Sequence, residues 1–319
     1  MRVLVIGGTR FMGPRVIARI LGAGHEVTAF HRGPSTHTVP EAARHIFGNR
    51  HDLPNHAVAI RGVQPDVVLD MMLITERNAV DLLDVLQGVD CRIVAASSCD
   101  VYASYGRLLR IESGEPDPNP LTEDSPLRQR LYPYRGDAPL AEDDPKRPMD
   151  DYDKILVERA LQAQAEHPWT ILRLPMVYGP DDYQRRLKPY LSRMDAGVTE
   201  IAIPSSEAAF SAARGYVENA AAAIALAVLD QRACNRVYNV ADEPTLDEAS
   251  WVRSIGAAAG WTGKVSIVPD TERPAEDTSD YRHHLDIDAT RIRRELDYTE
   301  PVTLAEALTQ TIEWERGQA

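Results

Sequence analysis

The sequence predicts an α/β fold built on a doubly wound parallel sheet. Two observations lead to this prediction: an apolar strand that runs directly into a glycine turn at the N-terminus, and a regular alternation of apolar strands with amphipathic helices after it. Strands that alternate with helices form parallel sheets covered on both faces. Ligands of such sheets bind at the carboxyl ends of the strands.

The first strand, Val3–Ile6, delivers the backbone to Gly7, and a helix is expected to begin near Phe11. The free N–H groups and the positive dipole end of that helix would face a pyrophosphate. Gly7 allows the tight turn, and Gly13 lets the helix pack close to the sheet. The usual third glycine is replaced by Arg10. Such a loop also closes ordinary strand-to-helix turns, but here a complete strand–helix–strand unit supports a dinucleotide site.

The alternation continues along the first half of the chain. We expect strands at Glu26–Phe30, within 64–72 and at Arg92–Ser98, and a helix at Ala79–Leu86. Because the carboxyl ends of parallel strands share one edge, one cleft should contain Gly7 to Arg10, Arg32, Met71 and Ser97-Ser98.

Residues 103–149 form a long connection rich in Pro, Asp, Glu and Arg. Such connections are uncommon within compact domains, and we interpret this one as a substrate lid, with a mobile surface insertion as the alternative. The later elements expected are a helix from near Asp151 to Gln164, a strand at Trp169–Leu174, a helix at Val217–Leu229 and a strand at Val237–Val240.

Composition narrows the classes of function. The net charge of −13, from 35 Lys and Arg against 48 Asp and Glu, argues against a general nucleic-acid surface. No apolar run approaches the roughly 20 residues of a membrane span. Three cysteines without a close pair, and a first core strand that leaves no room for a signal peptide, favour the cytoplasm. The nine histidines lack a ligand spacing such as H-E-x-x-H, so no catalytic metal is expected.

Several short motifs, in order, resemble those of the extended short-chain dehydrogenase/reductases, the NAD(P)-dependent epimerase/dehydratase family. The pieces are Ser97–Tyr102, Lys154–Glu158, Leu172–Pro180, Arg214–Asn219, Val237–Val240 and Arg291–Tyr298. The N-terminal Gly-Gly-Thr-Arg-Phe-Met-Gly also resembles an atypical branch that includes chloroplast stem-loop-binding proteins.

The resemblance implies a Rossmann domain, residues 1–180 and 215–244, and a small C-terminal α/β substrate domain, residues 181–214 and 245–319. It also suggests a homodimer formed through the helix that carries Lys154 and the helix near Val217.

The nucleotide is predicted from the residues after the second strand. A carboxylate there would bind the ribose of NAD, but this chain has Phe30-His31-Arg32-Gly33. A guanidinium can bind a phosphate through two hydrogen bonds, and Arg10 could join Arg32, so NADP is preferred over NAD. The alternative is that Arg32 caps a surface turn and Arg10 folds over the loop. The resemblance implies that Asp52 binds the adenine amine, and the other expected cofactor residues are Gly7, Thr9, Phe11, Met12, Gly13, Met71, Lys154 and Pro175.

Hydride transfer at a carbinol needs an acid/base group and a hydrogen-bond donor. The resemblance assigns the donor to Ser98 and the lysine to Lys154, with a tyrosine four residues before the lysine. That position holds Asp150, whereas Tyr152 would point about 200° away on a regular helix. Three readings stay open: Tyr152 precedes the helix and enters the site, Asp150 is the base, or the site binds nucleotide without turnover. An Asp150–Lys154 pair is also an ordinary helix salt bridge.

Two further sets of residues are candidates. Dehydratases of the family have two acidic residues after the Ser or Thr, and here Cys99 and Asp100 occupy these positions. Asp100 is therefore an auxiliary acid or base, or else it bonds the neighbouring turn, and Cys99 is expected only to pack. An anionic or polyol substrate could be bound by residues at the end of the last strand and in the long connection: Arg173, Tyr178, Pro180, Arg128, Arg130, Tyr132, Tyr134 and Arg135. The alternative is that the arginines and tyrosines of the connection are simply solvated surface residues.

The sequence thus favours a cytoplasmic, NADP-preferring epimerase, dehydratase or reductase that acts on a small molecule, such as a sugar nucleotide or a related hydroxylated metabolite. The alternatives are a nucleotide-binding sensor or scaffold without turnover, and an RNA-binding protein like the chloroplast relatives, which the charge opposes.

Overall fold

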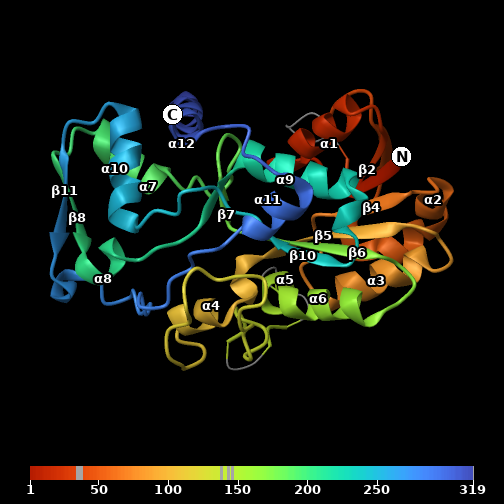
Figure 1. Cartoon of the computed structure of the whole chain (residues 1–319), viewed down its shortest axis with the longest axis horizontal. Helices are drawn as coiled ribbons and strands as arrows, with labels where there is room; N and C mark the ends of the chain where they lie inside the picture. Colours follow the sequence, from red (N-terminus) through yellow and green to blue (C-terminus); the bar gives the residue numbers. More distant parts are fainter. Residues whose placement is uncertain (34–38, 137–138, 142–143, 145–146, 319) are drawn as a thin grey trace.

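Buried apolar strands form the centre of the molecule. The computed structural model describes residues 1–33, 39–136, 139–141, 144 and 147–318. Seven parallel strands form one sheet in the order β10-β6-β5-β4-β1-β2-β3 (Figure 1). Their bounds are β1 (Arg2–Ile6), β2 (Glu26–His31), β3 (Arg44–Phe47), β4 (Val67–Asp70), β5 (Arg92–Ser98), β6 (Trp169–Leu174) and β10 (Arg236–Asn239). The predicted doubly wound parallel sheet is confirmed.

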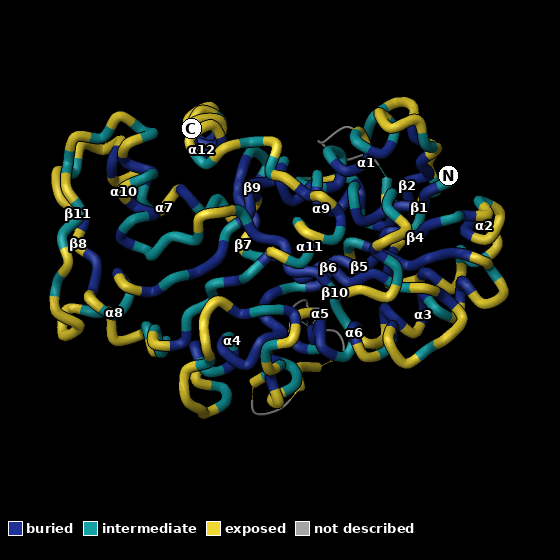
Figure 2. The backbone as a smooth tube through the Cα atoms, viewed as in Figure 1, coloured by how far each residue is buried: buried dark blue, intermediate teal, exposed yellow. Residues whose placement is uncertain are grey.

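Helices cover both faces of the sheet, which explains why its strands are continuous apolar runs (Figures 1 and 2). On one face lie α1 (Met12–Gly22) and α9 (Val217–Leu229), and on the other α3 (Glu76–Leu86) and α6 (Lys154–Ala163). The two faces have separate cores. Because side chains alternate along a strand, Val3 and Val5 join the core under α1, whereas Leu4 and Ile6 join the core under α3.

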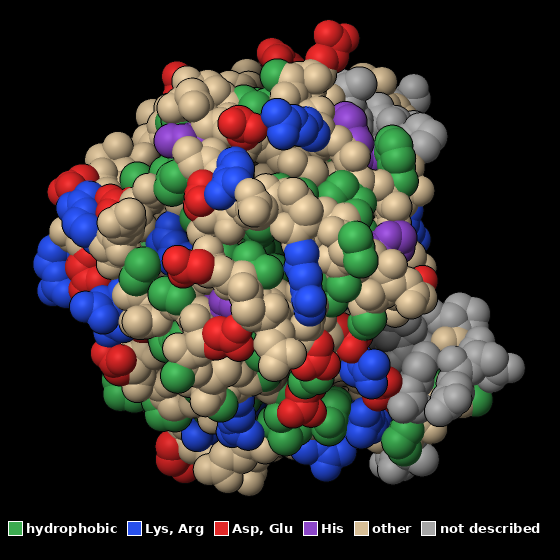
Figure 3. Space-filling view, turned by 90° about the vertical axis from the view of Figure 1, so that its right-hand side faces the viewer, with side chains coloured by type: hydrophobic (Ala, Val, Ile, Leu, Met, Phe, Trp, Pro, Cys, Tyr) green, Lys and Arg blue, Asp and Glu red, His purple; other side chains and the backbone are tan. Residues whose placement is uncertain are grey.

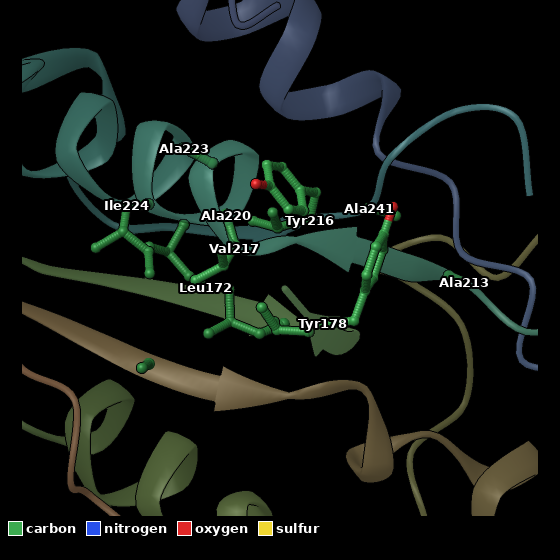
Figure 4. Close-up of a cluster of buried hydrophobic side chains, with 14 of the residues drawn as sticks. Leu172, Tyr178, Ala213, Tyr216, Val217, Ala220, Ala223, Ile224 and Ala241 are labelled. Carbon is green, nitrogen blue, oxygen red and sulfur yellow. The ribbon is translucent and has the colours of Figure 1, made fainter. Parts of the chain in front are cut away.

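Helix α9 is almost entirely buried. Figure 4 shows Val217 and Ile224 on the side of this helix that faces Leu172 of β6. Its outer side packs against α1, with Arg15 and Arg19 of α1 paired to Glu218. This helix is therefore covered within one chain, which leaves α6 as the more accessible of the two helices suggested for a dimer contact.

A smaller α/β region lies at the end opposite the N-terminus (Figure 1). It contains the parallel pair β8 (Glu200–Pro204) and β11 (Lys264–Val268) with α7 (Lys188–Asp195), α8 (Ser205–Ala208) and α10 (Glu248–Ala259). A second parallel pair, β7 (Met176–Tyr178) and β9 (Arg214–Tyr216), joins it to the sheet, and α12 (Leu304–Gly317) packs on α10. Helix α11 (Thr290–Leu296) contacts β10. The predicted small C-terminal α/β region is confirmed.

Two segments differ from the sequence-based expectation. Strand β3 was not among the strands expected from the sequence, because an edge strand is largely exposed and needs no apolar run. The connection 103–149 was expected to lack regular structure, but it contains α4 (Ala103–Leu108) and α5 (Arg147–Asp150). Leu121 in this connection is buried and bridges Ile287. Part of the proposed lid lies outside the described residues. Helix α2 (Ala57–Gly62) lies between β3 and β4 in the chain.

Figure 3 views the end of the molecule that carries the N-terminus and α2. Over the described residues of this face, basic and acidic side chains are interspersed, and hydrophobic ones are scattered between them. Among the described helices, none is both long and apolar enough to cross a membrane.

The turn after β1 requires glycine at two positions. Gly7 has a φ of 84°, a backbone conformation that residues other than glycine rarely adopt. A Cβ added at Gly13 would lie 2.4 Å from the carbonyl carbon of Gly8, so α1 can approach the turn only without a side chain there.

We expect Gly13→Ala to destabilise the protein by about 1–3 kcal/mol, because the new methyl group must displace the Gly8 backbone. Urea unfolding of the purified variant measures this loss. Gly22→Ala in the same helix is the matched control, because nothing lies within 4 Å of its added Cβ, and it should be neutral or slightly stabilising. Equal stability of the two variants would contradict the close packing of α1 on the turn.

Candidate functional site

A cavity lies at the carboxyl ends of β1, β2 and β3, beside the point between β1 and β4 at which the order of the sheet reverses. Open α/β sheets bind ligands at such a reversal. The cavity has a volume of about 250 Å³ and is lined by Ile6, Gly7, Thr9, Arg10, Phe30, His31, Arg32, Gly48, Asn49, Arg50, His51 and Met72. Three of these residues are arginines, and none is Asp or Glu. Its electrostatics therefore favour an anionic group.

The three arginines have different surroundings. Arg50 is buried, with its guanidinium 2.9 Å from Asp70 Oδ2 and 2.6 Å from the carbonyl oxygen of Asn78. Arg10 and Arg32 are exposed at the cavity and come from the two loops that follow β1 and β2. The sequence predicts that Arg10 and Arg32 bind the same ligand, and in the structure both residues line one cavity.

Only some of the remaining cofactor candidates line this cavity. Gly7 and Thr9 line the cavity, whereas Phe11 and Met12 pack against the core. Asp52 is exposed and accepts a hydrogen bond of 2.6 Å from Asn55, and it is not one of the lining residues named above, whereas Asn49 is. Met71 packs toward the core, and its neighbour Met72 lines the cavity. Pro175 packs beside Gly215, away from this cavity.

The proton-transfer candidates meet at the end of β5. Ser98 caps the turn after this strand, accepting a hydrogen bond of 3.2 Å from the Asp100 N–H. That turn points the Asp100 carboxylate at Tyr152, whose hydroxyl donates to Asp100 Oδ2 at 2.6 Å. Both side chains are buried. Asp100 and Tyr152 are 52 residues apart, and only the tertiary fold joins them.

The predicted start of α6 near Asp151 is wrong, because the helix begins at Lys154. Asp153 is its N-cap and accepts a hydrogen bond of 2.9 Å from the Ile155 N–H. Tyr152 therefore precedes the helix, and the angle of a regular helix does not apply to it. Asp150 faces the opposite way, toward Arg135 and the Leu140 N–H, which donates to Asp150 Oδ2 at 3.0 Å. Of the two candidates, the structure places Tyr152 beside Asp100.

Lys154 is buried and bonded to the backbone. Its ammonium group donates to the carbonyl oxygens of Leu73 and Ala96, at 2.8 Å each, and so connects the segment after β4 to β5. The ammonium lies 5.9 Å from the centre of the Tyr152 ring. Burial lowers the pKa of Lys154 to about 8, against the opposing effect of the Asp100, Asp70 and Glu158 carboxylates.

Burial also sets the proton affinities of the Asp100–Tyr152 pair. It raises the pKa of Asp100, while the Tyr152 hydrogen bond and the charges of Arg128 and Lys154 act to lower it. It raises the pKa of Tyr152 well above its usual value, and the Asp100 charge raises it further. Ser98 acts to lower both pKa values. Tyr152 therefore holds its proton, and Asp100 is the acceptor next to it.

Two more tyrosines extend this pair toward the surface. The Tyr134 hydroxyl donates to Asp100 Oδ2 at 3.5 Å and lies 2.8 Å from the Tyr105 hydroxyl. Tyr134 was considered from the sequence only as a substrate contact, and Tyr105 was missed. Tyr134 could be noticed in the sequence because it forms an aromatic pair with Tyr132 in a polar loop. Nothing in the local sequence distinguishes Tyr105.

Comparison with known proteins identifies the family. The model of the NAD dependent epimerase/dehydratase family matches residues 3–241. The chain belongs to this family. The match contains Ser98, Asp100, Tyr152 and Lys154, so the whole constellation lies in the part of the chain that the family defines.

Solved structures of the family share the fold of this chain. UDP-glucose 4-epimerase of Thermotoga maritima, solved with UDP-glucose, is similar to this chain with a TM-score of 0.72 at 17% identity. The alignment covers 100% of this chain and 99% of the epimerase chain. dTDP-glucose 4,6-dehydratase of Bacillus anthracis, solved in complex with NAD, has a TM-score of 0.70 at 17% identity over 99% of this chain and 97% of its own.

A relative by sequence is the chloroplast stem-loop binding protein of 41 kDa b of Arabidopsis thaliana. It is 23% identical over 273 residues, which are 82% of this chain and 64% of that protein. The chain thus spans less than two thirds of the length of this relative.

Two of the arginines considered for binding an anionic substrate, Arg128 and Arg173, are buried and bonded within the chain, so these two side chains do not face a substrate. Arg173 is buried and binds both carboxylate oxygens of Glu158, at 3.1 and 2.7 Å. Arg128 is buried and donates to the Asp100 carbonyl oxygen and to Asp153. These interactions join the segment after β5 and the strand β6 to neighbouring elements within the protein interior. Cys99 is also buried, as expected for a packing residue.

We expect Arg173→Met to cost about 3–5 kcal/mol of stability, because it leaves the buried Glu158 carboxylate without its charged partner and with only the hydrogen bond from Ser97. Urea unfolding measures this loss. Arg130→Met removes an arginine that is exposed in the same region and should change stability by less than about 0.5 kcal/mol. If Arg173→Met instead left stability intact, the arginine would again be a candidate for substrate binding.

Proposed function

We propose that this chain is an NADP-preferring oxidoreductase of the epimerase/dehydratase type that acts on a sugar nucleotide or a related hydroxylated metabolite. The observation that carries the proposal is the hydrogen bond of 2.6 Å between the Tyr152 hydroxyl and Asp100 Oδ2, next to Ser98 at the end of β5. It supplies an acid/base pair at the sheet edge where a nucleotide site is expected.

The pair can move a proton in two linked transfers. A substrate hydroxyl gives its proton to the Tyr152 oxygen while Tyr152 gives its own proton to Asp100 Oδ2. One O–H bond breaks and one forms at each step, and the negative charge never has to remain on a phenol of raised pKa. A carboxylate whose pKa is raised by burial is a better base than one in water. In the reverse direction the same residues return the proton to the substrate oxygen.

Ser98 and Lys154 have supporting roles in this proposal. The Ser98 hydroxyl, beside Asp100 and Tyr152, would position the reacting oxygen. Lys154 remains largely protonated at neutral pH, and its charge favours the ionised form of Asp100. Because its ammonium is bonded to Leu73 and Ala96, it also holds the two strand ends in register around the pair.

The residues at the β1–β4 edge fit a nicotinamide dinucleotide. Gly7 has the positive φ that the turn after β1 requires, Gly13 lets α1 pack closely on Gly8, and the N-terminus of α1 follows this turn, where it would face a pyrophosphate. The bound cofactor would supply reversible hydride transfer at the substrate carbon. Arg10 and Arg32 lie in a cavity whose described lining residues include no carboxylate, and they would hold the 2′-phosphate of NADP.

Substitution of the acid/base residues tests the chemistry. Tyr152→Phe and Asp100→Asn should each lower kcat by at least about 100-fold, because either change interrupts the proton path, while NADP affinity stays unchanged. Asp150→Asn is the control, since this carboxylate faces Arg135. Steady-state rates on a panel of sugar nucleotides, with binding measured by calorimetry, give both quantities. A larger loss in Asp150→Asn than in Tyr152→Phe would assign the base to Asp150.

Titration calorimetry with NADP and NAD tests the nucleotide preference. We expect tighter binding of NADP, and Arg32→Ala and Arg10→Ala should each weaken it by roughly 10-fold with little effect on NAD, because each removes a phosphate contact. Arg44→Ala, an exposed arginine of β3 outside the cavity lining, should change neither affinity. If neither nucleotide binds, the proposal of an enzyme is wrong, and the protein is instead a scaffold that kept the fold.

A further inference from the structure

A second cavity, of about 400 Å³, lies where the sheet meets the C-terminal region. It is lined by Tyr178, Ala212, Arg214, Asn219, Asp242, Glu243, Pro244, Thr245, Leu246, Trp251, Glu300, Val302, Thr303, Leu304 and Ala305. None of the residues proposed above for proton transfer or nucleotide binding belongs to this lining. Its volume falls within the range of about 300–1,000 Å³ typical of small-molecule sites.

Two buried oxygen atoms in this lining have no hydrogen-bond partner among the described residues. One is the hydroxyl oxygen of Tyr178, a side chain that is 2% exposed. Figure 4 shows this ring rising from β7 toward Ala241. The other is Asp242 Oδ1, whereas Oδ2 of the same carboxylate accepts from the Tyr216 N–H at 2.7 Å and from Asn219 at 3.0 Å. Buried polar atoms are nearly always bonded, so each of these two atoms indicates a missing partner. The carboxylate oxygen needs a donor, and the hydroxyl can accept from the same molecule.

The charge of the lining is negative. Asp242, Glu243 and Glu300 contribute carboxylates, and the only lining base among the described residues is Arg214, which is paired with Glu248. Arg293 pairs with Glu243 and Glu300 but lies outside the lining, and it leaves Asp242 Oδ1 unbonded. Burial raises the pKa of Asp242 to about 6, against the hydrogen bonds from Tyr216 and Asn219, so this carboxylate is ionised at neutral pH.

The aromatic residues of the lining also suit a cation. Tyr178 and Trp251 meet edge to face, with ring centres 5.1 Å apart. The Arg214 guanidinium already lies 4.4 Å from the centre of the Trp251 ring, as cations do over aromatic faces. Within the described part of the chain, no three His, Cys, Asp or Glu side chains are grouped to hold a metal ion. An organic cation therefore fits this lining better than a metal.

We propose that this cavity binds a small organic cation, an ammonium or guanidinium compound, whose N–H groups donate to Asp242 Oδ1 and to the Tyr178 hydroxyl oxygen. The bound molecule would connect β7 and β9 to the loop after β10 and to the segment before α12. It would thereby stabilise the junction between the sheet and the C-terminal region. The proposal does not depend on the reaction assigned to the other site.

Titration calorimetry and thermal unfolding of the full chain test this site with agmatine and n-butylamine as cationic probes and n-butanol as the uncharged probe. Both cations should bind and raise the melting temperature, and n-butanol should do neither. Asp242→Asn should weaken binding by at least about 10-fold, because it removes the charge and keeps the shape. Tyr178→Phe should weaken it by roughly 3- to 10-fold through the loss of one hydrogen bond. Asp297→Asn, the same change at an exposed carboxylate outside the lining, is the control and should have no effect.

Two results would overturn the proposal: no heat and no change in melting temperature with either cation at millimolar concentration, or binding that is undiminished in both Asp242→Asn and Tyr178→Phe. If Asp242→Asn does not fold, the Tyr178→Phe titration decides alone. Retained NADP binding and turnover alongside a negative result here would leave the proposed reaction intact.

Discussion

The N-cap of α6 is the interaction on which the rest of the site depends. The Asp153 carboxylate accepts a hydrogen bond from the Ile155 N–H, accepts another of 2.7 Å from the Tyr132 N–H, and pairs with the buried Arg128. Aspartate is among the preferred N-cap residues because its side chain bonds the free N–H groups of the first turn. By starting the helix at Lys154, this cap leaves Tyr152 outside the helix, where its hydroxyl reaches Asp100.

Buried ion pairs reinforce this arrangement. Arg128 with Asp153, and Arg173 with Glu158, tie the ends of β5 and β6 to α6 and to the connection that follows β5. Such pairs contribute little net stability because both ions lose their hydration, but they penalise any arrangement in which one partner is missing. They therefore fix the position of the reacting groups more than they stabilise the fold.

The two cavities have opposite electrostatics, and the fold explains why. The first lies where the loops after β1 and β2 meet, and these loops carry Arg10 and Arg32 beside a helix N-terminus. The second lies at the junction with the C-terminal region, where the loop after β10 and the segment before α12 bring in Asp242 and Glu300. Although the net charge of the molecule is −13, the described lining of the first cavity contains three arginines and no carboxylate.

The sequence by itself determined the parallel sheet and the glycine turn, because buried strands such as Val3–Ile6 and close contacts such as that at Gly13 restrict the residue types at each position. It also placed Arg10 and Arg32 on loops that share an edge. Only the tertiary structure decided the partner of Tyr152. Helix periodicity cannot show where a helix starts when the cap is held by Arg128, 25 residues earlier, and a hydrogen bond between residues 52 apart leaves no local pattern in the sequence.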